Sequence, residues 1–144
     1  MILIDTGPLV ALCDKKDSLH STARQQLKLL VKNPLAVCEP VLAEACFLLR
    51  APSQRERLRV TLDGLHVSSV LTDHVATMRQ DIFEWMLKYQ DHEPDWADAT
   101  LAVLCGHDRR LKVWTFDKEF RTTWRTLAGS PIPLAIRTQV NFPV

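Results

Sequence analysis

The first useful observations about this sequence concern what it lacks. No apolar run approaches the roughly 18 residues that a membrane-spanning helix needs, and Asp5 interrupts the first such run. We therefore expect no membrane span and no signal peptide. None of the four cysteines forms a C-x-x-C pair, and none of the five histidines has H-x-x-x-H spacing. These absences argue against a zinc site and indicate a cytoplasmic protein with reduced cysteines.

Several catalytic signatures are absent as well. The chain has no G-x-S-x-G motif and no Cys–His signature of a nucleophilic hydrolase. It also lacks the G-x-x-x-x-G-K-[ST] loop that binds nucleotide phosphates. The formal net charge is only +1, so the overall charge does not indicate a nucleic-acid partner. Any functional site must therefore be sought in local clusters of residues.

The length and the pattern of apolar residues indicate one α/β domain covering residues 1–144. Strands are expected at 2–5, 35–38, 66–71, 111–116 and 132–136. Helices are expected near 18–32, 40–50, 54–64, 73–89, 95–106 and 118–127. This alternation predicts a three-layer α/β/α sandwich around a mostly parallel sheet of four to five strands. Open sheets of this type bind ligands beyond the carboxyl ends of their strands.

Two aspartates stand at the ends of predicted strands. Asp5 follows the apolar run 2–4, and Asp117 follows the strand that ends at Phe116. Since parallel strands end at the same edge of a sheet, both carboxylates are expected there. Each also has a simpler interpretation. Asp5 before Thr-Gly-Pro suits a turn, and Asp117 suits the N-cap of the next helix.

Two further acids fall within the apolar stripes of predicted helices. Glu44 lies in "PVLAEACFLL" and Asp98 in "DWADATLAVLC", each at helical spacing from apolar neighbours. We interpret both as mid-helix positions, where capping does not explain an acid. Burial of an unpaired carboxylate is costly, so each should find a cation or a proton. Asp95, one turn before Asp98, suits an N-cap as well as a site role.

Acids gathered at one sheet edge predict a bound cation, because they would otherwise repel one another. Lys118 and Arg121 can pair with one or two of them. A divalent ion with all-oxygen ligands, Mg²⁺ or Mn²⁺, compensates the whole cluster more simply. Such an ion supports hydrolysis of a phosphate ester by activating water.

Basic and hydroxyl side chains lie close to Asp117 in the sequence. Lys118 and Arg121 could offset the acidic charge and hold a phosphate backbone nearby. Thr115 has two interpretations. It is either an ordinary strand residue, since Thr favours strands, or a residue whose hydroxyl holds an acid or a substrate phosphate. Most arginines of a second basic stretch, "LLRAPSQRERLR", are interpreted as solvated helix surface.

Four stretches of the chain resemble the PIN-domain nucleases, in the order expected for that family. They are "DTGPLVALCDKKDSLH", "VLAEACFLL", "DWADATLAVL" and "WTFDKEFRTTWR". Within the family, the chain resembles VapC-type ribonuclease toxins of toxin–antitoxin pairs. The resemblance covers nearly the whole chain. It implies a compact α/β/α sandwich and an endoribonuclease that depends on Mg²⁺ or Mn²⁺.

The resemblance also implies roles for individual residues. It assigns an acidic quartet, which here consists of Asp5, Glu44, Asp98 and Asp117. Asp5 and Asp98 would be the most direct metal ligands. Thr6 and Thr115 match hydroxyl positions beside the acids, and Asp95 matches an additional acid found in part of the family. An RNA substrate, a homodimer and a small antitoxin that inserts a segment into the groove are also implied.

The stretch from Asp17 to His20 and the single residue Trp96 are interpreted separately from the acidic quartet. The stretch from Asp17 to His20 recurs in such proteins, but we interpret it as helix capping and packing. Trp96 departs from the family pattern, because a smaller aliphatic residue is usual at its position. We expect this substitution to alter the groove beside Asp95.

Two alternatives are weighed against a nuclease. One is a catalytically silent PIN-like domain that binds RNA or protein. The other is a phosphotransferase with Asp5 as its nucleophile, which usually needs a second Asp two residues later, where this chain has Gly7. Metal-dependent RNA cleavage that EDTA abolishes separates a nuclease from a silent module.

Overall fold

A parallel β-sheet forms the centre of the computed structural model, which describes residues 1–72 and 76–137. The described strands are β1 (Ile2–Ile4), β2 (Leu35–Cys38), β3 (Ser68–Val70) and β4 (Lys112–Trp114). They form one four-stranded sheet in the order β3-β2-β1-β4, and every pairing is parallel. The predicted α/β fold with a parallel sheet is therefore confirmed.

Strand β1 positions Asp5, the first acid of the predicted quartet. Leu3 pairs with Ala36 of β2 on one side and with Val113 of β4 on the other. All three β1 residues are buried, as expected for a parallel strand that is covered on both faces. Asp5 follows directly, so its backbone is anchored by one of the two inner strands of the sheet.

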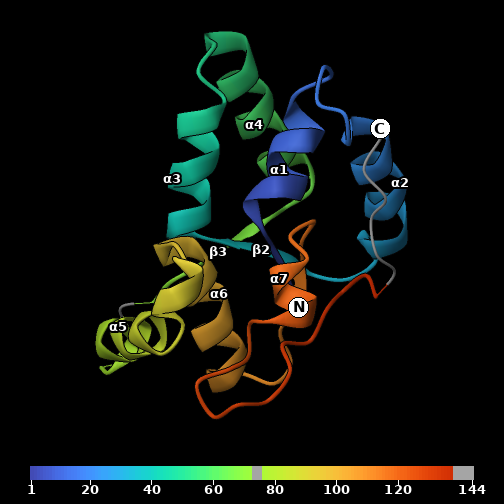
Figure 1. Ribbon diagram of the computed structural model, residues 1–144. Helices are drawn as coiled ribbons and strands as arrows, with labels where there is room; N and C mark the ends of the chain where they lie inside the picture. Colours follow the sequence, from blue (N-terminus) through green and yellow to red (C-terminus); the bar gives the residue numbers. More distant parts are fainter. Residues whose placement is uncertain (73–75, 138–144) are drawn as a thin grey trace.

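Helices cover both faces of this sheet (Figure 1). The described helices are α1 (Thr6–Cys13), α2 (His20–Leu30), α3 (Glu39–Leu48), α4 (Pro52–Gly64), α5 (Met78–Lys88), the 3₁₀ turn η1 (Gln90–His92), α6 (Trp96–His107) and α7 (Glu119–Thr122). Helices α1, α3 and α4 lie on one side, and α5 and α6 on the other (Figure 1). The chain first moves outward from β1 to β3 and then crosses to β4, so the order reverses between β1 and β4. Ligands of such sheets bind at this reversal.

Helix α1 was not predicted from the sequence, which indicated only a turn after Asp5. Its eight residues include Gly7 and Pro8, which usually weaken a helix. Pro8 lies in the first turn, where a missing N–H is tolerated. Six of the eight residues are buried, and α1 packs against α2, α3 and α4. A helix enclosed in this way has no polar face, so periodicity does not reveal it.

The carboxyl-terminal predictions were partly wrong. The expected strand at 132–136 is reduced to a single bridge between Leu134 and Val113. Pro133 lacks the N–H that would extend this ladder. The helix expected at 118–127 ends at Thr122. Of the helix expected at 73–89, residues 73–75 lie outside the described residues, and α5 covers the later part.

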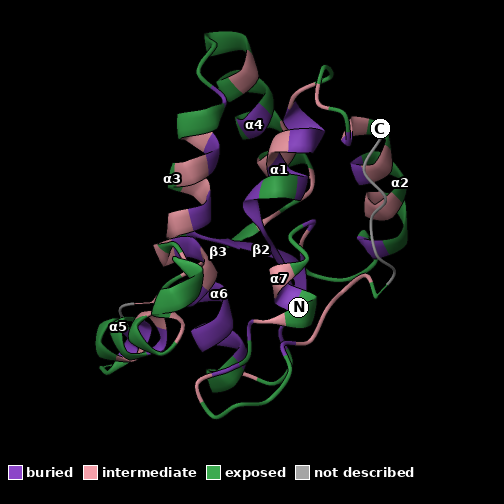
Figure 2. Cartoon of the chain, viewed as in Figure 1, coloured by how far each residue is buried: buried purple, intermediate pink, exposed green. Residues whose placement is uncertain are grey.

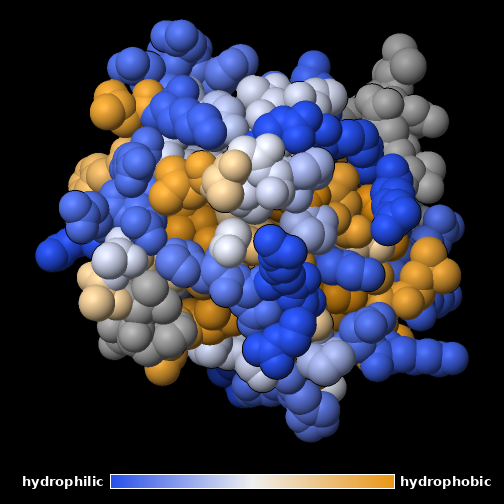
Figure 3. Space-filling model, turned by 90° about the horizontal axis from the view of Figure 1, so that it is seen from below, coloured by the Kyte–Doolittle hydropathy of each residue, from blue (hydrophilic) through white to orange (hydrophobic). Residues whose placement is uncertain are grey.

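Buried residues concentrate on β1, β2 and β4 and on the inward faces of the helices (Figure 2). The largest fully buried side chains include Trp85, Trp114 and Phe120. The four cysteines are all free thiols. No helix in the described part of the chain is both long and apolar enough to cross a membrane. The face seen from below mixes hydrophilic side chains with smaller hydrophobic patches (Figure 3).

Candidate active site

A cavity of about 320 Å³ lies beyond the carboxyl ends of β1 and β4. Its lining includes all four acids of the predicted quartet together with Thr6 and three further residues of note, Gly7, Asp17 and Asp95. None of the described residues that line it is basic. Acids from four separate parts of the sequence therefore converge where the strand order reverses.

Asp5 is both a helix cap and a member of this acidic cluster. One carboxylate oxygen, Oδ1, accepts a hydrogen bond of 2.8 Å from the Thr6 N–H at the start of α1. The other oxygen, Oδ2, accepts one of 2.7 Å from the Thr115 hydroxyl. Only 7% of Asp5 is exposed. The two interpretations of Asp5 are thus compatible, because the capping bond fixes the carboxylate at the cavity wall.

Thr115 connects the two strand ends. Its hydroxyl donates to Asp5 and accepts a 2.9 Å hydrogen bond from the Asp117 N–H. Asp117 Oδ1 in turn accepts a 2.9 Å hydrogen bond from the Glu119 N–H, so Asp117 caps the turn that leads into α7. Asp117 is exposed, in contrast to Asp5. Thr115 is therefore more than strand composition, because it joins both acids.

Asp95 and Asp98 form a reciprocal pair at the start of α6. The Asp98 N–H donates to Asp95 Oδ1 at 2.7 Å, and the Asp95 N–H donates to Asp98 Oδ2 at 3.4 Å. Asp95 is the predicted N-cap. The interpretation of Asp98 as a mid-helix acid was wrong, because Asp98 lies in the first turn and takes part in capping.

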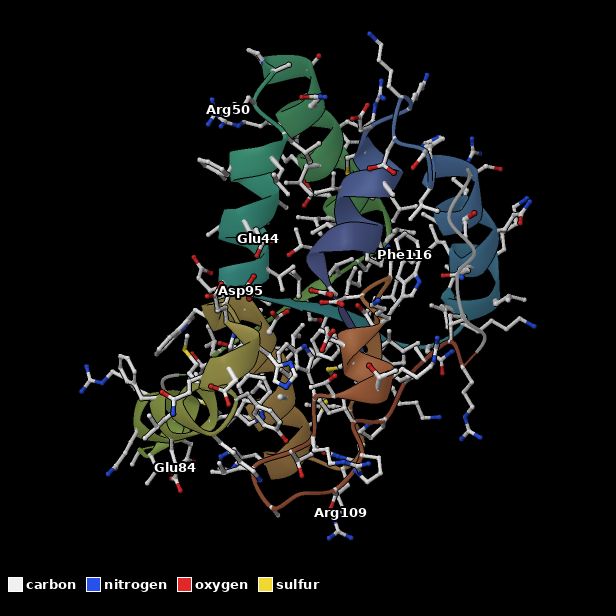
Figure 4. The ribbon with its side chains drawn as sticks, in the orientation of Figure 1. Glu44, Arg50, Glu84, Asp95, Arg109 and Phe116 are labelled. Atoms are coloured by element: carbon white, nitrogen blue, oxygen red, sulfur yellow. The ribbon has the colours of Figure 1, made fainter. Side chains whose placement is uncertain are left out.

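Glu44 is the acid for which capping gives no explanation. It lies at the sixth position of the ten-residue helix α3 and is half-buried. Glu44 on α3 and Asp95 just before α6 lie close together across the space between the two helices (Figure 4). Glu44 thus extends the acidic wall to the neighbouring helix.

The cluster raises the pKa values of three of its carboxyl groups. Burial raises the pKa of Asp5 to about 6, although the hydrogen bonds from Thr115 and Thr6 oppose this effect. Burial, followed by the charges of Asp95 and Asp5, raises the pKa of Asp98 to about 8. Burial and the same two charges raise the pKa of Glu44. The charged form of the cluster is therefore unfavourable unless a cation joins it.

The structure changes the interpretation of three residues, Asp17, Lys118 and Arg121. Asp17 does cap a turn, since its Oδ1 accepts from the Leu19 N–H at 2.8 Å, but its side chain also lines the cavity. The stretch from Asp17 to His20 was the signal that could have revealed this. Lys118 and Arg121 are exposed residues near Asp117, and neither is among the residues that line the cavity. Arg121 donates to the Ile136 carbonyl at 3.3 Å.

The donor set suits a hard cation, but the side chains do not form a closed metal site. Within residues 1–72 and 76–137, no group of three or more His, Cys, Asp or Glu side chains is arranged to hold one ion. An all-oxygen cavity favours Mg²⁺ or Mn²⁺ over softer metals. Mg²⁺ usually keeps several waters and takes only one or two carboxylates directly. The residues present therefore fit a hydrated ion, with the remaining acids acting through water.

Comparison with known proteins agrees with this geometry. A family model for the PIN domain matches residues 2–124. The chain belongs to the PIN-domain family. The PIN-domain fold is typical of nucleases, and PIN-domain nucleases typically use Mg²⁺. The four acids of the quartet all fall inside the matched segment, and so does Asp95.

One solved structure shows how far the likeness extends. It is the crystal structure of VapC20 from Mycobacterium tuberculosis, which is described as a toxin that cleaves the sarcin–ricin loop. The match covers 84% of this chain and 93% of that chain, with 23% sequence identity and a TM-score of 0.65. At 23% identity, the likeness to VapC20 is a likeness of fold alone. No curated protein sequence matches the chain.

Proposed function

We propose that this PIN domain is a metal-dependent endoribonuclease. The observation that carries the proposal is the convergence of Asp5, Glu44, Asp98 and Asp117 on one cavity without a basic residue in its lining. A structural core does not require such a cluster, since burial and mutual repulsion make its charged form costly. A divalent cation removes that cost and makes the cavity useful for phosphodiester hydrolysis.

Asp5 and Asp98 are the residues proposed to hold the cation. They are the acids whose pKa values burial raises to about 6 and about 8, so a positive charge beside them changes their ionisation most. Thr115 orients the Asp5 carboxylate, as outer hydrogen bonds commonly do for metal ligands. When bound, Mg²⁺ or Mn²⁺ supplies polarisation of the phosphoryl group and activation of water.

The other polar residues are proposed to position water and substrate. Glu44 has a raised pKa, which makes its carboxylate a better proton acceptor near neutral pH. Asp95 and Asp117 complete the acidic wall, and the buried Thr6 lines the same cavity. Lys118, just before α7, and Arg121, within α7, are exposed and are proposed to contact the phosphate backbone of RNA.

The wider biological role is also a proposal. The sequence resemblance to VapC-type toxins, together with the fold of VapC20, supports a cytoplasmic toxin of a toxin–antitoxin pair. We propose that residues 1–144 act as one domain in a homodimer and that a small antitoxin inhibits cleavage by entering the acidic groove. Co-expression with the product of a short overlapping upstream reading frame, where one exists, tests this role by co-purification.

Cleavage of a defined RNA panel tests the enzymatic proposal. Purified protein should cut single-stranded RNA in the presence of Mg²⁺ or Mn²⁺, and EDTA should abolish the products. The variant Glu44→Gln, which preserves shape and removes the charge, should lose cleavage while it stays folded. RNA binding without cleavage under any divalent metal would instead favour the silent binding module.

A further inference from the structure

A second cavity, of about 530 Å³, adjoins the acidic cavity. The two cavities share Glu44 and Asp95, so they meet along the wall formed by α3 and the start of α6. The remaining lining residues are Trp96, Pro40, Ala43 and Ala97, together with the polar Glu39 and Thr72. The surface that they expose to the second cavity is nevertheless mainly apolar, in contrast to its neighbour.

Trp96 provides an aromatic ring at this cavity. It is the first residue of α6 and is only partly buried against the core. The ring is held from one direction by Phe83 of α5, whose centroid lies 5.0 Å away at an interplanar angle of 69°. The cavity residues from α3, Pro40 and Ala43, are small and leave space beside the ring. The arrangement suits insertion of a flat ligand next to the indole.

The charges at the cavity restrict which ligand can enter. Glu39, Glu44 and Asp95 contribute carboxylates to the lining, and none of the described lining residues is Lys or Arg. A phosphate would be repelled there, whereas an uncharged ring with amino groups would be accepted. The part of an RNA chain that is flat, uncharged and carries N–H hydrogen-bond donors is the nucleobase.

We propose that this second cavity binds the nucleobase adjacent to the cleaved phosphodiester, by stacking on Trp96. The inference rests on the proposed nuclease function, because the shared wall of Glu44 and Asp95 places the base next to the phosphate site. Base–aromatic stacking tolerates every base type, since each base has a π-face. Trp96 thus becomes a residue that positions RNA.

The first test measures binding at Trp96 without relying on cleavage. In protein labelled with ¹⁵N at tryptophan, the indole N–H signal of Trp96 should shift when a short single-stranded RNA is added. An RNA of equal length that lacks bases should cause no such shift. The indole N–H groups of Trp85 and Trp114 serve as internal references, because each donates a 2.7 Å hydrogen bond inside the protein. Equal shifts at Trp96 with both RNAs, or none with either, would overturn the subsite.

The second test compares variants by RNA affinity and by cleavage position. Trp96→Ala should weaken binding of base-containing RNA about 5- to 150-fold, the range typical of the loss of one stacked base. It should also flatten the modest base preference that differences in stacking strength produce at one position beside the cut, measured in a random-sequence RNA pool. Trp96→Phe should largely restore both properties. Phe47→Ala, which removes an exposed aromatic ring of α3 outside both cavities, should change neither.

The two tests separate this inference from the nuclease proposal. A Trp96 shift without any metal-dependent cleavage would keep the base-binding subsite and reject the nuclease. If Trp96→Ala leaves cleavage unaffected and the Trp96 signal shows no specific shift, the nuclease proposal is supported and the base-binding subsite is contradicted. Unchanged reference signals from Trp85 and Trp114 in each variant show that the fold is intact.

Discussion

Asp98 illustrates how one carboxylate combines a structural with a proposed catalytic role. Its backbone N–H and its side chain both take part in the reciprocal cap with Asp95 at the start of α6. Its carboxyl group also faces the acidic cavity, where burial and the charges of Asp95 and Asp5 raise its pKa to about 8. The cap is compatible with either protonation state of Asp98, whereas the cluster favours the neutral one.

Replacement of Asp98 by Asn should separate these two roles. Asn keeps the shape and can still accept from the Asp95 N–H, but it carries no charge. In EDTA near pH 8, we expect Asp98→Asn to stabilise the protein by about 1 kcal/mol, since it relieves repulsion in a partly exposed cluster. In Mg²⁺ the same variant should lose RNA cleavage by at least about 100-fold. Urea unfolding and cleavage assays measure the two effects.

A matched substitution outside the cavity is Asp63→Asn, since Asp63 lies on the exposed surface of α4. It should leave both cleavage and its metal dependence unchanged. An Asp98→Asn protein that is markedly less stable yet still cuts RNA would show that Asp98 acts mainly as a cap.

At the scale of elements, the connection between α3 and α4 keeps Glu44 at the cavity. The Arg55 guanidinium donates to the Cys46 carbonyl at 2.9 and 3.2 Å and to the Leu49 carbonyl at 2.9 Å. These carbonyls belong to the carboxyl-terminal end of α3, whose last C=O groups lack partners within the helix. Arg55 thus fixes the helix that carries Glu44, which a solvated surface arginine would not do.

Replacement of Arg55 by Ala should therefore lower stability by about 1 kcal/mol, because three charge-assisted hydrogen bonds are lost at an exposed turn. Arg57→Ala is the matched control. Arg57 is exposed on α4 and forms no hydrogen bond or ion pair with the described residues. The midpoint of urea unfolding measures the difference. Equal midpoints for the two variants would contradict the capping role of Arg55.

The sequence predicted the helices and strands whose apolar residues recur at helical or strand spacing. It did not predict elements that depend on something else, such as burial on several sides or a missing backbone N–H. Helix α1 is enclosed on several sides, so its sequence "TGPLVALC" has no polar face to mark it. The expected strand at 132–136 required a backbone N–H that Pro133 does not have. The acids at strand ends and Glu44 were identifiable because polar residues stood where apolar ones are usual. The lining role of Asp17 was hidden, because its capping bond to Leu19 already explained it.

At the scale of the whole molecule, the raised pKa values make stability depend on pH. Burial, with neighbouring charges, raises the pKa of Asp5 to about 6 and of Asp98 to about 8. The folded protein therefore keeps protons that the unfolded chain has released above about pH 4. Stability from these groups is complete below that pH and is lost as pH rises through the folded pKa values.

We accordingly expect the protein in EDTA to lose about 2 kcal/mol of stability between about pH 5 and pH 8. Saturating Mg²⁺ should remove most of this decline, because a bound cation favours the ionised acids. Urea unfolding at several pH values, with EDTA or Mg²⁺, provides the measurement. A metal-free stability that rises toward pH 8 would show that the carboxylates are not strained by burial and repulsion.

The most direct test of the central claim, that the acidic cavity holds a divalent cation, is the change in melting temperature on adding Mn²⁺. At a concentration 100 times the dissociation constant, binding should stabilise the wild-type protein by about 2.7 kcal/mol and raise its melting temperature by several degrees. Asp5→Asn, which keeps the size and shape of the buried Asp5 side chain but removes its charge, should show little or no rise. Equal rises in the two proteins would contradict the account and leave Asp5 as the cap of α1 alone.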